Sequence, residues 1–135
     1  MHFVSVTRLR IRRWRYLPAF FYFTLLSLVQ ARRVQGHLAT SIQREPHRVF
    51  WTITVWRDEP AMRAFRNHGT HQRAMPKLRA WCDEATYVHW HQSTAEPPDL
   101  ATAFDRLVLE GIVSRVNHPS PDHAPRNFSR PSKPQ

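Results

Sequence analysis

Strands are predicted where apolar residues alternate with polar ones or where β-branched and aromatic residues cluster. The run RVFWTITVWR at residues 48–57 is the strongest such segment, because most of its positions are β-branched or aromatic. The turn Glu45-Pro46-His47 separates it from the strand before it and suggests a hairpin. The predicted strands are residues 2–11, 37–44, 48–57 and 85–92, with a short terminal strand at 111–116.

Helices are predicted from apolar positions three and four residues apart and from their end signals. The four helical segments are residues 17–34, 58–69, 70–82 and 100–110. Asp58 is a good N-cap for the second helix, and Gly69 is a plausible stop. Pro76 is expected to break or restart the third helix. Residues 17–34 are apolar nearly all round, which predicts a helix buried on several sides or one that spans a membrane.

The order strand, helix, strand, strand, helices, strand predicts an α+β, ferredoxin-like βαββαβ fold with an antiparallel sheet. Helices cover one face of such a sheet and leave the other bare. Residues 48–57 are apolar on both faces, with Trp51 and Trp56 on opposite ones, so the second face needs a cover. A second copy of the sheet is the simplest cover, which predicts a C2 homodimer arranged as a dimeric α/β barrel.

Length and composition predict one folded domain followed by a tail. The chain has 135 residues, of which 41% are hydrophobic, enough for one core. We assign residues 1–116 to the domain. Residues 117–135 hold five of the eleven prolines and few apolar side chains, so we expect a disordered Pro-rich tail there.

Positive charge is concentrated at the N-terminus. The net charge is +10, and residues 1–50 carry nine arginines against one acid, Glu45. The cluster between Arg8 and Arg15 has no nucleic-acid motif beside it, so a nucleic-acid partner is not expected. Two interpretations stay open: a solvated basic edge, or peripheral contact with an anionic membrane beside the apolar helix.

The N-terminal 31 residues also resemble a secretory signal, with a basic run, an apolar stretch at residues 16–29 and a small-x-small site. The strand pattern before it and the cations and glycine that close the helix favour a folded segment. Cys82 is the only cysteine, which excludes an intramolecular disulfide and favours the cytoplasm, with membrane association as an alternative.

Short motifs between residues 50 and 90 resemble a known family. They are WTITVW at 51–56, AMRAF at 61–65, GTH at 69–71, AMPKL at 74–78, WCDEA at 81–85 and His89-Trp90. Together they resemble an uncharacterised bacterial family related to spheroidene monooxygenase, within the dimeric α/β-barrel superfamily of the antibiotic-biosynthesis monooxygenases. The resemblance covers residues 4–118. It implies the same ferredoxin-like dimer, and in each subunit a pocket between sheet and helices for a hydrophobic small molecule.

The resemblance also implies candidate site residues. His71 falls on the Gly-x-His element and would act as a general base or, if haem is bound, as the axial ligand of its iron. Aromatic residues would wall the pocket, namely Trp51, Trp56, Phe65 and Trp81. Trp51 and Trp56 are an odd number of residues apart, so they line one cavity together only if a bulge intervenes.

The predicted function is a monooxygenase-like or haem-associated oxidoreductase acting on a hydrophobic substrate. The alternative is a non-catalytic ligand-binding dimer that uses the same pocket. His68, His71, His89 and His91 form a weaker candidate metal site, since His-x-His on a strand is a known ligand spacing. Cys82 is interpreted as a buried apolar group, because Asp83 and Glu84 beside it disfavour a thiolate.

Overall fold

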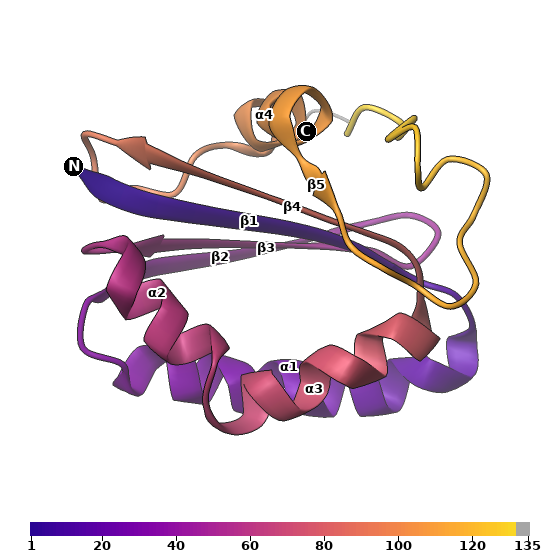
Figure 1. The fold of residues 1–135 in the computed structure, drawn as a ribbon, viewed down its shortest axis with the longest axis horizontal. Coiled ribbons are helices and arrows are strands. Elements are labelled where there is room, and N and C mark those ends of the chain that lie inside the picture. Colours follow the sequence, from indigo (N-terminus) through magenta and orange to yellow (C-terminus); the bar gives the residue numbers. More distant parts are fainter. Residues whose placement is uncertain (132–135) are drawn as a thin grey trace.

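The computed structural model describes residues 1–131, in which a five-stranded antiparallel sheet carries helices on both faces (Figure 1). The strand order is β2-β3-β1-β4-β5. The first four strands have the ferredoxin-like order, so the predicted fold class is confirmed. The strands are β1 (His2–Ile11), β2 (His37–Glu45), β3 (Val49–Trp56), β4 (Cys82–Gln92) and β5 (Ile112–Val113).

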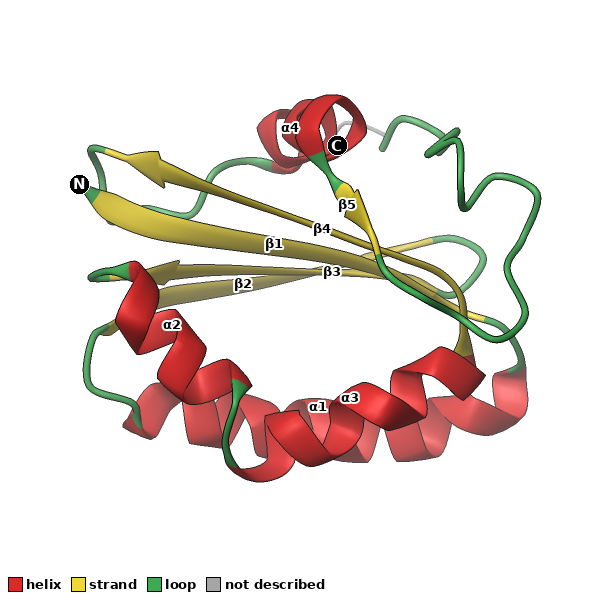
Figure 2. Ribbon diagram, viewed as in Figure 1, coloured by secondary structure: helices red, strands yellow, loops and turns green. Residues whose placement is uncertain are grey.

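Three helices form a layer on one face of the sheet (Figure 2). They are α1 (Leu17–Arg33), which follows a 3-10 turn at Trp14–Tyr16, α2 (Glu59–Arg66) and α3 (Gly69–Trp81). Asp58 caps α2 as expected, because its Oδ1 accepts a hydrogen bond of 3.0 Å from the backbone N–H of Ala61. The fourth helix, α4 (Leu100–Glu110), lies on the opposite face.

Three local predictions are wrong. Pro76 lies inside α3 without ending it. The proline has no N–H to donate to the carbonyl of Gln72, but its side chain is exposed and the helix continues to Trp81. The strand predicted at residues 85–92 begins earlier, at Cys82 opposite Ile11 of β1, so Asp83 and Glu84 belong to β4. The first helix is not buried on several sides, since one side of α1 faces solvent.

Alternation along the central strands gives the sheet two apolar faces. The helix layer lies against the face that carries Leu9, Phe50 and Trp56. Val4, Val6, Trp51, Ile53, Val55 and Val88 lie on the other face and are buried there with Ala103, Phe104 and Leu107 of α4 and with Phe128 of the C-terminal segment. The outer face is therefore covered within one chain, and the homodimer is not needed to bury it.

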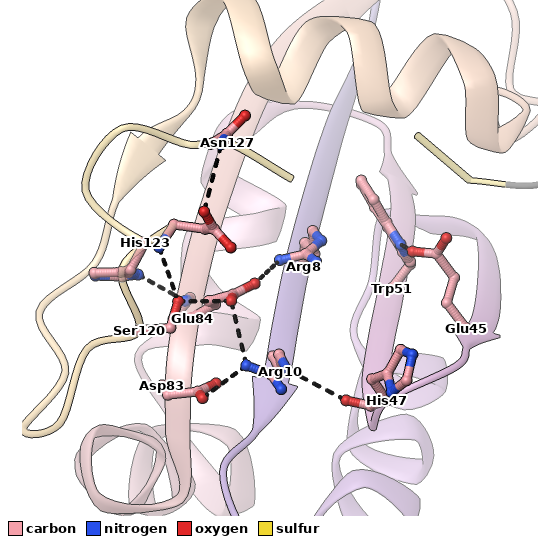
Figure 3. A network of polar contacts seen from close by, with 12 residues as sticks. Arg8, Arg10, Glu45, His47, Trp51, Asp83, Glu84, Ser120, His123 and Asn127 are labelled. Atoms are coloured by element: carbon pink, nitrogen blue, oxygen red, sulfur yellow. Dashed lines mark hydrogen bonds and ion pairs between the residues drawn. The ribbon is translucent and has the colours of Figure 1, made fainter. Parts of the chain in front are cut away.

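An ion-pair network anchors the C-terminal segment to this outer face (Figure 3). Arg8 Nη1 lies 2.7 Å from Glu84 Oε1, and both side chains are almost fully buried. Ser120 Oγ donates a 2.7 Å hydrogen bond to the second carboxylate oxygen of Glu84. The ring of Phe128 lies 4.0 Å below the Arg8 guanidinium, at cation–π distance.

His123 adds a second anchor. Its Nε2 donates to the Ser114 carbonyl at 2.9 Å, since a carbonyl only accepts, and its Nδ1 accepts the Ala85 N–H at 3.3 Å. The structure thus packs residues 117–131 against the sheet, whereas the sequence led us to expect a disordered tail there. Few apolar residues are needed, because one aromatic ring and several paired polar groups replace a conventional core. Residues 132–135 of that prediction lie outside the described residues.

Candidate functional site

A cavity of about 670 Å³ lies between the helix layer and the sheet. Its sheet wall carries hydroxyl and imidazole groups, supplied by Ser5, Thr7, Thr52, Thr54, Tyr87 and His89. Its helix wall is mostly apolar, with Phe20, Phe23, Leu28, Met62, Phe65, Ala74 and Trp81 among its residues. This combination of an apolar surround with a few polar groups is typical of small-molecule sites.

The mouth of the cavity lies between α3 and β5. Met75 and Arg79 of α3 line the cavity and are also exposed to solvent, and the same holds for Ile112 and Arg115 near β5. Arg66 lines the cavity from the end of α2. The polar edge of a ligand would therefore meet guanidinium groups, whereas its apolar body would lie deeper.

His71 projects into this cavity from the first turn of α3. Its ring packs on Phe65 with 4.5 Å between centroids, and its Nδ1 lies 3.3 Å from the Arg66 carbonyl oxygen. Because that oxygen only accepts, Nδ1 carries the proton and Nε2 keeps a lone pair. Nε2 forms no hydrogen bond with any residue in the described part of the chain. It is therefore available to a ligand or a proton.

The cavity keeps His71 neutral near pH 7. Burial lowers its pKa below the ordinary value of 6.5, and the Arg66 charge lowers it further, against an opposing effect of the hydrogen bond to the Arg66 carbonyl. Burial also lowers the pKa of His89 across the cavity. A neutral imidazole with a free nitrogen can accept a proton or bind a metal.

Gln30 of α1 fixes the turn that presents His71. Its Nε2 donates to the carbonyls of Phe65 and His68, at 3.0 and 2.6 Å, and its Oε1 accepts the backbone N–H of His71 at 3.0 Å. Gly69 adopts a φ of +62° in this turn, and a Cβ there would approach the Gln30 amide to 3.1 Å. Gln30 is not among the residues predicted from the sequence; an amide side chain in a largely apolar helix was the signal for it.

The structure brings together only part of the predicted aromatic set. Phe65 and Trp81 line the cavity with His71. Trp56 is fully buried behind Phe65, with 5.3 Å between the ring centroids, and does not reach the cavity. Trp51 lies on the opposite face of the sheet, where its Nε1 donates to Glu45 Oε2, so its predicted pocket role is not supported. The two residues take opposite faces, as their spacing predicts.

The predicted histidine cluster is not assembled as a metal site. Within residues 1–131 no group of three or more His, Cys, Asp or Glu side chains has a metal-binding arrangement. His68 and His91 are exposed, although His89 and His91 share a strand face as expected. Burial raises the pKa of the Cys82 thiol to about 12, with a further contribution from Asp83, so Cys82 is not a nucleophile at neutral pH.

One protein family matches most of the chain. The profile of the DUF3291 domain, described as a domain of unknown function, matches residues 28–111, from the second half of α1 to the residue after α4. The chain belongs to the DUF3291 family. This DUF3291 match includes His71, Phe65 and Trp81 but not β1. No match is found among curated proteins.

Solved structures share the fold of this DUF3291 protein. SnoaB, a cofactor-independent oxygenase from Streptomyces nogalater, is 19% identical with a TM-score of 0.57 over 72% of this chain and 98% of its own. An antibiotic biosynthesis monooxygenase is 15% identical with a TM-score of 0.60, covering 68% and 99%. A conserved protein from Methanosarcina mazei is 11% identical with a TM-score of 0.62, covering 69% and 94%. These likenesses show that the chain shares the ferredoxin-like fold of these proteins.

Proposed function

We propose that this chain binds a flat or elongated hydrophobic molecule in the cavity and oxidises it as a monooxygenase-like protein. The observation that carries the proposal is the unpaired Nε2 of a neutral His71 in a largely apolar cavity of about 670 Å³. The resemblance to the spheroidene monooxygenase branch favours a polyene or a polycyclic ring system as substrate. SnoaB, which shares the fold, is a cofactor-independent oxygenase, and that is an additional reason for oxygen chemistry.

His71 would act as the general base. Its Nε2 takes a proton from an acidic CH₂ group of the substrate, and the hydrogen bond from Nδ1 to the Arg66 carbonyl stabilises the imidazolium that forms. The substrate carbanion then reduces molecular oxygen, and the balanced reaction converts CH₂ and O₂ into a carbonyl group and water. The substrate supplies all the electrons, so no external reductant is required. Hydroxyls such as that of Tyr87 would hold the substrate's oxygen atoms.

Haem is a second candidate ligand, and the residues present fit it. The free Nε2 of His71 would hold the iron, and Phe65 already packs on that ring. Arg66, Arg79 and Arg115 line the cavity and would offer guanidinium groups to the carboxylates of haem. Bound haem would supply redox chemistry at an iron centre, while the chain's own residues hold it and exclude water.

Oxygen uptake by the purified protein tests the oxygenase. Anthrone is a suitable probe, because it is flat and apolar and its central CH₂ is acidic. We expect uptake above the uncatalysed rate for the wild type and a loss of at least about a hundredfold in His71→Ala, the usual scale of a general base. His68→Ala is the matched control, since His68 is exposed three residues earlier and does not line the cavity. Equal rates in both variants would refute the role of His71.

Titration with haemin tests the haem alternative. A saturable Soret band that His71→Ala removes and His68→Ala retains would support it, and competition by imidazole would confirm iron ligation. A folded protein without such a band, and without oxygen uptake, would contradict both enzyme proposals and favour the non-catalytic ligand-binding protein.

Filling the cavity tests whether it is the binding site in any of these cases. Ala74 is buried on α3 and faces the cavity, so Ala74→Phe should block binding of anthrone and haemin. Ala64→Phe places the same ring on the exposed side of α2 and should leave binding intact. The homodimer also stays a prediction, and light scattering coupled to size-exclusion chromatography tests it.

A further inference from the structure

The solvent side of α1 is apolar, whereas the solvent side of an ordinary surface helix is polar. Phe21, Tyr22, Leu25 and Val29 are all exposed to solvent, and Leu25 is 61% exposed. The opposite side of the same helix lines the cavity with Phe20, Phe23 and Leu28. Residues 16–31 contain no charged side chain at all. We name the four exposed residues the α1 patch.

Arginines stand at both ends of the α1 patch. Arg13 and Arg15 precede the helix, and Arg32 and Arg33 close it; all four are exposed. None of the four forms an ion pair within the described residues 1–131, and the first acid of the sequence is Glu45. Trp14, 72% exposed, lies beside the first pair. The patch is thus an apolar strip with a tryptophan and unpaired positive charge at its ends.

The strip continues onto the edge strand of the sheet. Ile42 of β2 is exposed and, with Phe21, lines a hollow of about 230 Å³ between α1 and that edge. Arg44 lines the same hollow and adds another cation to its rim. An isolated exposed apolar residue needs no explanation, but a contiguous apolar strip marks an interaction surface.

Charge decides between a second copy of the chain and a membrane as the occupant. In a two-fold pairing of the α1 patch with the two helices side by side, arginines of one copy would lie against arginines of the other, because both ends are positive. An anionic lipid surface offers the complementary charge and accepts apolar side chains between its headgroups. Tryptophan and tyrosine are the residues that favour this boundary.

We propose that α1 docks this protein on anionic lipid bilayers, with the helix lying in the plane of the interface. The α1 patch enters the headgroup and upper acyl region, and the arginines at both ends contact lipid phosphates. No helix within residues 1–131 is long and apolar enough to cross a membrane, which agrees with a helix that lies on the surface. Since the inner side of α1 lines the cavity, docking would place that cavity directly above the lipid. The inference does not depend on any activity of the cavity.

Vesicle binding of the full chain tests the proposal. We expect co-sedimentation with vesicles of phosphatidylcholine containing about one third phosphatidylglycerol, little with pure phosphatidylcholine, and release by salt. Leu25→Gln should weaken binding at least about tenfold. Arg32→Gln/Arg33→Gln should do so by a similar factor, because each arginine near an anionic surface contributes roughly fivefold. Leu109→Gln is the matched control, since Leu109 is 77% exposed on α4, beyond the opposite face of the sheet.

Tryptophan fluorescence gives an independent readout of depth. Of the five tryptophans, Trp51 and Trp56 are fully buried and Trp81 and Trp90 are half-buried, whereas Trp14 is exposed. A blue shift on adding anionic vesicles should therefore come mainly from Trp14 and be largely lost in Trp14→Phe. Absence of binding to anionic vesicles overturns the proposal, as does equal loss in Leu25→Gln and Leu109→Gln. Light scattering that shows a dimer for the wild type and a monomer for Leu25→Gln would also overturn it, in favour of pairing between copies.

Discussion

Arg8 and Glu84 form a buried ion pair, 2.7 Å from Nη1 to Oε1, between the two central strands β1 and β4. The pair lies under the C-terminal segment, and Ser120 of that segment completes the coordination of the carboxylate. A buried carboxylate is stable only when its charge and lone pairs are satisfied. The pair therefore links the packing of residues 117–131 to the centre of the sheet.

Removal of one partner of this pair should destabilise the folded protein much more than removal of both. Glu84→Ala leaves the Arg8 charge buried without its carboxylate, and we expect a loss of about 3–5 kcal/mol in the free energy of unfolding. The double variant Arg8→Met/Glu84→Leu replaces the pair with apolar groups of similar size and should recover most of that loss. Urea denaturation of the three proteins checks both expectations. Equal stability of Glu84→Ala and the wild type would show that the pair is not formed.

The same carboxylate predicts acid sensitivity. Burial by itself raises the pKa of Glu84, but hydrogen bonds from Arg8 and Ser120 and the nearby arginine charges lower it below the ordinary 4.5. The unfolded chain then binds the proton more readily than the folded chain in acid. The stability that Glu84 contributes is complete above pH 4.5 and is lost as the pH falls through the lower folded value.

Burial raises the pKa of Asp83, so Asp83 affects the pH dependence of stability in the opposite direction. The difference between the stability curves of the wild type and a Glu84 variant isolates the contribution of Glu84. Unfolding free energies of the wild type and Glu84→Gln should be measured between neutral pH and acid. We expect the gap between the two proteins to narrow below pH 4.5. A gap that stays constant across this range would contradict the lowered pKa.

Phe128 should contribute strongly to stability despite its place near the C-terminus. Its ring is buried in the outer core and contacts the Arg8 guanidinium. Phe128→Ala is expected to cost about 3 kcal/mol, within the usual range for a buried phenylalanine. Pro125→Ala in the same segment is the control, because Pro125 is exposed. If thermal unfolding midpoints show equal small effects for the two variants, the segment is not packed as described.

The periodicity of the sequence was sufficient to predict the elements and their order. Residues 2–11 carry Val4 and Val6 on one face and Leu9 and Ile11 on the other, and that strand forms as expected. The cover of the outer face was not predictable in the same way. A segment such as residues 117–131 has no hydrophobic period, and its packing depends on single long-range partners, Phe128 with Arg8 and Ser120 with Glu84. Local patterns carry no signal for such contacts.

The candidate site was predicted in its centre and less well at its edges. His71 was found because its motif and its helix position coincide, and Phe65 and Trp81 followed from their neighbourhood in the motifs. Trp51 was included for its size and aromatic character, although alternation along β3 already placed it opposite Trp56. Gln30 was missed because its function arises from the approach of α1 to the turn before α3, and sequence spacing does not show that approach.

The protonation of His71 can be measured directly. Its Nδ1 donates to the Arg66 carbonyl, so nitrogen-detected NMR should show the tautomer with a proton on Nδ1 and an unprotonated Nε2 at neutral pH. Burial lowers its pKa, so the ring should titrate below 6.5, and any base function would be lost as the pH falls through that lower value. Gln30→Ala frees the turn, and the pKa of His71 should then rise toward the ordinary 6.5 as its ring becomes more exposed. A wild-type His71 that titrates at or above 6.5 would contradict the neutral base on which the oxygenase proposal depends.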